Sequence, residues 1–186
     1  NGELERRKEQ KATIKIRCER AAEIANKKKD FVTVWCNLNA EGDLLESLIP
    51  GSIQVSGKDS DEKKEEKLIA FTKGQVRVII TKPKIGAWGL NWQHCNHVVS
   101  FATHSYEQYY QSVRRCWRFG QTEPVDLDVI ATIGELRVLG NMRSKAQKAD
   151  AMFSALLKEM NNAQTIKPTN RFTVDTEAPS WLCKTT

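Results

Sequence analysis

The sequence predicts an α/β fold in which a mainly parallel central sheet is flanked by helices on both faces. Short apolar, β-branched runs recur along the chain, and segments with helical character lie between most of them. Apolar strands that alternate with helices indicate a parallel sheet that is buried on both sides. At 186 residues, 40% of them hydrophobic, the chain is long enough for one domain with an arm or tail.

The N-terminal region, residues 1–30, is predicted to contain a helical arm and the first helix. Residues 1–12 are almost wholly charged or polar, which is typical of a solvated helix. From Ile14 onward the apolar positions recur at three and four residues, through Cys18, Ala21 and Ala25, as on one face of a helix. Because the chain starts with Asn1 and not with Met, we expect it to be part of a longer protein.

The main domain is predicted over residues 31–160, and an irregular tail over residues 161–186. Strands are expected at 31–36, 52–55, 76–81, 97–101 and 125–131. Helices are expected at 43–49, 59–71, 106–118 and 133–160, the second opening with a capping-box pattern at Asp59 and Glu62. Ligands of parallel sheets bind outside the carboxyl ends of the strands, so the loops after the strands are the expected functional sites.

Charge and cysteine content narrow the class of protein. The net charge of +6 and a pI near 9.1 favour a polyanionic partner such as nucleic acid, although surplus cations also simply keep a chain soluble. The five cysteines include no Cys-x-x-Cys pair, so we expect buried, reduced thiols. No apolar run is long enough for a membrane span, and no signal peptide is recognisable. We therefore predict no membrane partner, and no metal site is expected from the spacing of His94, Cys95, His97, His104 and Cys116.

An arginine-rich run, residues 111–121, is the main candidate for function. On a regular helix, Gln111, Arg115 and Arg118 would share one face. The opposite face would pack on the sheet and would consist of Tyr106, Tyr109, Tyr110, Val113 and Trp117. Guanidinium groups presented together bind phosphate oxygens and offset the charge that develops in phosphoryl transfer. A solvated face with salt bridges is the alternative, but the nearest acids are only Glu107 and Glu123.

The spacing Gln111-x-x-x-Arg115-x-x-Arg118-x-Gly120-Gln121 resembles the last conserved motif of superfamily-two helicases, in the form found in Swi/Snf-like DNA translocases. The segment 86–91, Gly-Ala-Trp-Gly-Leu-Asn, is similar to the Gly-x-Gly-Leu-Asn element of that family. Weaker elements occur in the expected order, and the resemblance covers roughly residues 31–160. The sequence of residues 106–118 is most similar to that of phage or prophage-type relatives. The chain departs from the family at Ala102 and His104, before the arginine helix, and at Lys82.

The resemblance implies a RecA-like three-layer sandwich that acts as the second motor domain of an ATP-dependent nucleic-acid helicase or translocase. ATP with Mg²⁺ would be bound mainly by an N-terminal RecA-like domain of the same protein, which would close on this one. Arg118 would be the arginine finger on the γ-phosphate, and Arg115 a second phosphate or interdomain contact. Gln111, Gly89 and Asn91 would line the same cleft.

No phosphate-binding loop of the Gly-x4-Gly-Lys-Ser/Thr type occurs in the sequence. The segment Gly57-Lys58-Asp59 comes near it, but Asp59 replaces the hydroxyl residue that would hold magnesium. We therefore expect this chain alone to hydrolyse essentially no ATP.

Nucleic acid is the expected partner on the loops after the first three strands. Asn37, Gly57, Thr81 and Lys82 are the candidate contacts, and they would bind backbone phosphates in a salt-sensitive, sequence-independent way. Double-stranded DNA is the form that the resemblance favours, in a bacterial or phage-infected cytoplasm. Trp88 would either stack on a base or, as we prefer, pack under its loop. Whether strands are separated stays open.

Two other functions are compatible with the sequence. One is a RecA-like module that binds nucleic acid without any ATPase partner. The other is a protein-interaction module that uses the N-terminal arm and the long helix from Ile133 as docking surfaces.

Overall fold

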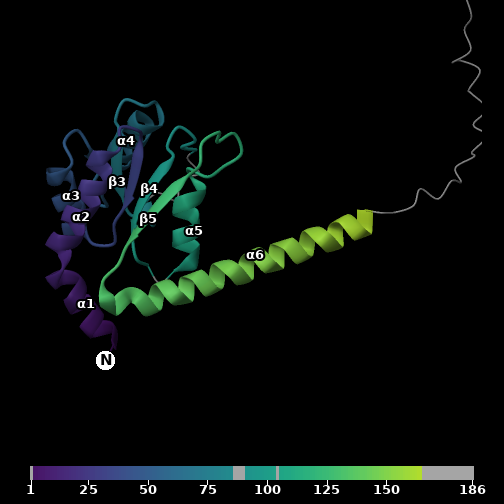
Figure 1. Cartoon of the computed structure of the whole chain (residues 1–186). Coiled ribbons are helices and arrows are strands. Elements are labelled where there is room, and N and C mark those ends of the chain that lie inside the picture. Colours follow the sequence, from purple (N-terminus) through teal and green to yellow (C-terminus); the bar gives the residue numbers. More distant parts are fainter. Residues whose placement is uncertain (1, 86–90, 104, 165–186) are drawn as a thin grey trace, which may run out of the picture. The chain divides into compact units, whose positions relative to one another are not determined.

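The structure is a computed structural model, and it describes residues 2–85, 91–103 and 105–164 (Figure 1). Contacts divide the chain into two units, residues 1–146 and 147–186. The sheet and its covering helices belong to the first unit. The elements are α1 (Gly2–Ala12), α2 (Ile14–Lys27), β1 (Val32–Trp35), α3 (Asn39–Leu48), β2 (Ile53–Gln54), α4 (Asp61–Thr72), β3 (Val78–Thr81), β4 (His97–Phe101), α5 (Tyr106–Arg114), β5 (Asp126–Ile130), the 3₁₀ turn η2 (Ile133–Glu135) and α6 (Leu136–Gln164).

The predicted α/β fold with a parallel sheet is confirmed. The five strands form one sheet in the order β2-β3-β1-β4-β5, and every neighbouring pair is parallel. Central β1 pairs on both sides, with Val34 opposite Ile80 of β3 and Val99 of β4. Because all strands run the same way, the sheet has one edge of carboxyl ends and one edge of amino ends.

Helices cover both faces of the sheet, as the alternation of side chains along β1 requires. Val32 and Val34 point into one core, and Trp35 points into the other. The first core lies under α2 and α3 and consists mainly of Cys18, Ala21, Ala22, Ala25, Leu45, Ile49, Val78, Ile80, Val99 and Phe101. The second lies under α4 and the segments next to α5 and contains Val55, Leu68, Phe71, Ile79, Trp92, Cys95, Val98 and Cys116.

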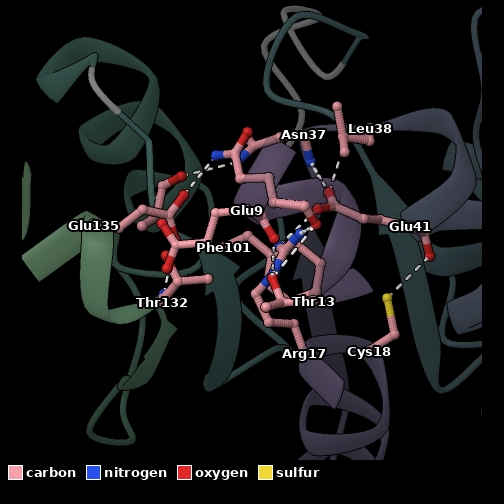
Figure 2. Close-up of polar contacts among 12 residues, drawn as sticks. Glu9, Thr13, Arg17, Cys18, Asn37, Leu38, Glu41, Phe101, Thr132 and Glu135 are labelled. Atoms are coloured by element: carbon pink, nitrogen blue, oxygen red, sulfur yellow. Dashed lines mark hydrogen bonds and ion pairs between the residues drawn. The ribbon is translucent and has the colours of Figure 1, made fainter. Parts of the chain in front are cut away.

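Helix α2 buries its predicted apolar stripe and, in addition, one arginine. Arg17 is 4% exposed, and its Nη1 atom lies 2.7 Å from Oε1 of Glu41 in α3 (Figure 2). The guanidinium also stacks on the ring of Phe101, 5.0 Å from its centroid. Glu41 Oε2 accepts the backbone N–H groups of Asn37 (2.8 Å) and Leu38 (2.9 Å). This buried ion pair, which the sequence analysis did not anticipate, joins α2, α3 and the carboxyl end of β1.

The arm is helical, as predicted, but its last turn is not simply solvated. The side-chain amide of Gln10 donates to Glu135 Oε1 at 2.5 Å, and Glu9 Oε1 accepts the N–H of Gly134 at 3.2 Å. Figure 2 labels Glu9 and Glu135 together with Thr13 and Arg17. The junction of α1 and α2 is therefore attached to the 3₁₀ turn that follows β5.

Helix ends differ from the predicted ones by a few residues. Helix α4 is capped by Ser60, whose Oγ accepts the N–H of Lys63 at 3.3 Å, so the cap lies one residue after the predicted Asp59. Helix α6 is preceded by a 3₁₀ turn and continues to Gln164. Within the described ranges, no helix combines the length and the apolar character that crossing a membrane requires.

Candidate functional site

The arginine run lies at the amino edge of the sheet, opposite to the edge where functional loops were expected. Helix α5 starts after β4 at the carboxyl edge and runs back toward the start of β5. The Trp92 N–H donates to the carbonyl oxygen of Arg115 at 2.9 Å, and the Gln121 side chain donates to that of Cys95 at 3.1 Å. Because Trp92 and Cys95 directly precede β4, the run packs on the segment that enters this strand.

The prediction that one helix extends through Arg118 is wrong. Helix α5 ends at Arg114, and the next residues form a turn in which the N–H groups of Cys116 and Trp117 both donate to Val113 O. The chain then turns again, with Gln121 N–H bonded to Arg118 O at 3.0 Å and a positive φ of 94° at Gly120. Gln111 and Arg118 are both exposed, but only Gln111 lies on the helix.

Arg115 is buried, although the predicted helix placed it on the face opposite the aromatic residues. Its side chain is buried at 8% exposure, and its guanidinium stacks on the indole rings of Trp35 (5.6 Å) and Trp92 (5.4 Å). Burial lowers the pKa of Arg115, and the nearby charge of Arg118 lowers it further. Arg115 and Arg118 are thus close enough to interact electrostatically, yet one is buried and the other is exposed.

The predicted packing face of α5 is only partly buried: Tyr106, Tyr109 and Val113 are half-buried, but the other two members are exposed. Tyr110 and Trp117 are 40% and 55% exposed, and both of their rings contact the guanidinium of Arg114. The buried residue of α5 is Ser112. A planar guanidinium packs well on aromatic faces, which accounts for the buried position of Arg115 against Trp35 and Trp92.

Asn91, one of the predicted nucleotide contacts, lies close to the arginine run. It is exposed and directly precedes Trp92, whose N–H binds the backbone of Arg115. Gly89, the other predicted member of this cleft, and Trp88 lie outside the described residues. So does His104.

A small set of hydrogen bonds fixes the turn that carries Arg118. The sequence did not predict these bonds. The Gln121 side chain donates to the carbonyl oxygens of Cys95 (3.1 Å) and Cys116 (3.3 Å) and accepts the N–H of Glu123 (3.1 Å). The Gln93 side chain donates to the carbonyl oxygen of Phe119. Gln121 is the last residue of the quoted motif, whereas Gln93 could have been marked only by its proximity to the Gly-x-Gly-Leu-Asn element.

The predicted nucleic-acid contacts all gather at the carboxyl edge. Thr81 ends β3 but is only 1% exposed, and its hydroxyl donates to Val55 O at 3.4 Å, so it is not available to a ligand. Lys82 follows it with its ammonium bonded to the side-chain oxygen of Asn39. Gly57 is exposed in the turn after β2. The Asn37 side chain already donates to Ala102 O at 2.8 Å, so Lys82 and Gly57 are more available to a ligand than Asn37.

One segment joins the two edges. It leaves the carboxyl edge at Lys82 and reaches the amino edge at Asn91, beside Arg115. This connection carries the Gly-x-Gly-Leu-Asn element, of which residues 86–90 lie outside the described residues. The connection from Lys82 to Asn91 therefore links a candidate nucleic-acid contact to a candidate nucleotide contact.

The cysteines in the described part of the chain are buried free thiols, as predicted. A hydrogen bond from Cys116 lowers the pKa of Cys95, while the same bond and burial raise the pKa of Cys116. Burial raises the pKa of Cys18 and of Cys36 to about 12. Among the described residues, no group of three or more His, Cys, Asp or Glu side chains is arranged to hold a metal ion.

Part of the chain is similar in sequence to known proteins. Two curated proteins, each described as bifunctional helicase and thymine dioxygenase JBP2, from Leishmania infantum and Leishmania major, are 28% identical over 114 residues. These residues are 60% of this chain but 10% of either relative, so the chain spans about a tenth of their length.

Solved structures show the same fold at low sequence identity. The C-terminal domain of S. cerevisiae Dbp5 aligns with a TM-score of 0.62 at 12% identity, over 72% of this chain and 80% of that one. The C-terminal part of the Fun30 ATPase domain aligns with a TM-score of 0.51 at 19% identity, over 57% of this chain and 37% of that one. The three-layer architecture is that of RecA-like helicase C-terminal domains.

The family model for the helicase conserved C-terminal domain matches residues 14–120, which is more than half of the chain and includes both Arg115 and Arg118. The chain therefore belongs to the family of helicase conserved C-terminal domains.

Proposed function

We propose that the chain is the second motor domain of an ATP-dependent, Swi/Snf-like helicase or DNA translocase, and that Arg118 is its arginine finger. The observation that carries the proposal is the contrast between the two arginines: Arg118 is exposed on a turn bonded to the sheet edge, whereas Arg115 is buried. An exposed guanidinium on a fixed turn is preorganised to meet a phosphate brought by another domain.

The partner in this proposal is a first RecA-like domain that supplies the phosphate loop and Mg²⁺. Arg118 would approach the γ-phosphate when the two domains close, and Asn91 and Gln111 would line the cleft. Arg115 would contact either a phosphate or the first domain, through the small fraction of its surface that stays exposed.

The carboxyl edge would bind the phosphate backbone of DNA through Gly57 and Lys82, with Asn37 at the same edge, whereas Thr81 is buried and would not reach the DNA. The net charge of +6 supports a polyanionic partner.

The test is an ATPase assay on the full-length protein with and without duplex DNA. We expect duplex DNA to stimulate hydrolysis and the stimulation to fall as salt rises. A triplex-displacement assay should show movement along duplex DNA. A full-length protein that binds DNA but never hydrolyses ATP would instead support the alternative of a non-catalytic binding module, and one that does neither would support a protein-interaction module.

Replacing Lys82 by alanine should weaken duplex binding by the full-length protein. One phosphate contact would be lost, so the slope of log K against log salt should become less steep by about 0.9. Fluorescence anisotropy across a salt series measures both quantities. Lys29→Ala is the matched control, because Lys29 is exposed just before β1, at the opposite edge of the sheet. Equal weakening by both substitutions would contradict a contact at Lys82.

A further inference from the structure

We infer that Gln121 is a positioning residue that holds the Arg118 guanidinium in place for ATP hydrolysis. The inference rests on the role proposed for Arg118. Gln121 is linked to the Arg118 turn through its backbone, since its N–H donates to Arg118 O at 3.0 Å. Its side chain is linked to the core, since Nε2 donates to Cys95 O at 3.1 Å and to Cys116 O at 3.3 Å.

The two acceptors make this amide a bridge between separate parts of the chain. Cys116 belongs to the turn after α5, and Cys95 belongs to the segment that enters β4. Both cysteines are 0% exposed, so their carbonyl groups are held by the packed core. Arg118 therefore lies between two residues that this amide connects, Cys116 two residues before it and Gln121 three residues after it. The bond to Cys95 O attaches both of them to the segment that enters β4.

Beyond the buried Cys116, apolar packing contributes little to the position of this turn. Phe119 is 99% exposed and Trp117 is 55% exposed, so neither side chain is buried in the core. The remaining constraints are polar: the Gln93 amide donates to Phe119 O, and Gly120 adopts a φ of 94° with the Gln93 amide 2.7 Å from the place of a Cβ. The position of Arg118 consequently depends on hydrogen bonds, and Gln121 makes most of them.

An amide is the side chain that these partners require. It must donate two N–H groups toward carbonyl oxygens and also accept the N–H of Glu123 at 3.1 Å. Glutamate has the same length but no donor when ionised, and its charge would face two carbonyl oxygens. Gln121→Glu and Gln121→Ala should therefore have similar effects, although only alanine changes the size of the side chain.

The inference is tested by steady-state and single-turnover ATPase kinetics on the full-length protein with duplex DNA. Gln121→Ala should lower kcat by about 10²-fold, since a displacement of about 1 Å in a catalytic group has that effect. KM and the affinity for a fluorescent ATP analogue should change by less than about two-fold, because the phosphate-loop domain binds the nucleotide. Gln75→Ala is the matched control, since Gln75 is exposed just before β3 at the same edge of the sheet, and it should leave kcat unchanged.

A double-mutant cycle separates positioning from a merely structural role. If Gln121 acts through Arg118, adding Gln121→Ala to Arg118→Ala should cause no further loss of kcat. Losses that multiply, or a Gln121→Ala protein with normal kcat beside an impaired Arg118→Ala protein, would overturn the inference and leave the arginine finger intact. Normal turnover in Arg118→Ala would instead overturn the proposed function, and the inference with it.

Discussion

Replacing Arg118 by alanine in the full-length protein should lower kcat for ATP hydrolysis by roughly 10³-fold or more. The guanidinium is exposed on a turn that is bonded to the sheet edge, so it would meet the γ-phosphate without reorganisation. ATP affinity should stay nearly unchanged, because the phosphate loop and Mg²⁺ lie on the other motor domain in the proposed assembly. Kinetics of phosphate release, together with binding of a fluorescent ATP analogue, measure the two quantities separately.

Arg114→Ala is the matched control for this experiment. Arg114 is also an exposed arginine of the same run, but its guanidinium contacts the rings of Tyr110 and Trp117 on the surface of α5. Its removal should change kcat by less than about two-fold. Normal turnover in Arg118→Ala, or equal losses in the two variants, would reject Arg118 as the arginine finger.

Replacing Arg17 by methionine should lower the free energy of unfolding of the chain by about 3–5 kcal/mol. The substitution keeps the apolar stem but leaves the Glu41 carboxylate, which is 1% exposed, without its partner at 2.7 Å. It also removes the hydrogen bond from Arg17 to Gln10 O at 2.6 Å and the contact with the Phe101 ring. Urea denaturation followed by far-UV circular dichroism measures the loss.

Two further variants show whether the buried charge causes this loss. Arg17→Met combined with Glu41→Gln should recover part of the stability, because no unpaired charge then remains in the core. Arg20→Met should cost less than about 1 kcal/mol, because the Arg20–Glu23 pair on the same helix is solvent-exposed despite its 2.6 Å separation. Similar losses for Arg17→Met and Arg20→Met would contradict the importance of burial.

The strands, their parallel order and the buried face of α2 could largely be predicted from the sequence. Short β-branched runs such as residues 78–81 predicted strands, and their parallel order followed from the helices between them. The stripe of Cys18, Ala21 and Ala25 identified the buried face of α2. These features depend on local periodicity, which is present in the sequence before any tertiary contact forms. The same alternation correctly collected Gly57, Thr81 and Lys82 at one edge of the sheet.

The arginine site depended on contacts between residues that are distant in sequence. Nothing local shows that Trp35 and Trp92 would leave space for the guanidinium of Arg115, yet this stacking decides which side of the run is buried. The end of α5 at Arg114 is likewise fixed by a partner elsewhere, since the Arg115 carbonyl accepts a bond from Trp92. The faces predicted for residues 106–118 differ from the observed ones because the prediction assumed a regular helix and ranked side chains by hydrophobicity.

The sequence by itself determined the α/β class, the strand order along the chain and the motif that contains Arg115 and Arg118, because these features follow from periodicity and spacing. Only the tertiary structure decided that Arg115 is buried, that Arg118 is exposed and that Gln121 joins their turn to the entry of β4. Aromatic stacking and backbone carbonyl acceptors are supplied by segments that fold next to the run, so the environment of each arginine exists only in the assembled sheet.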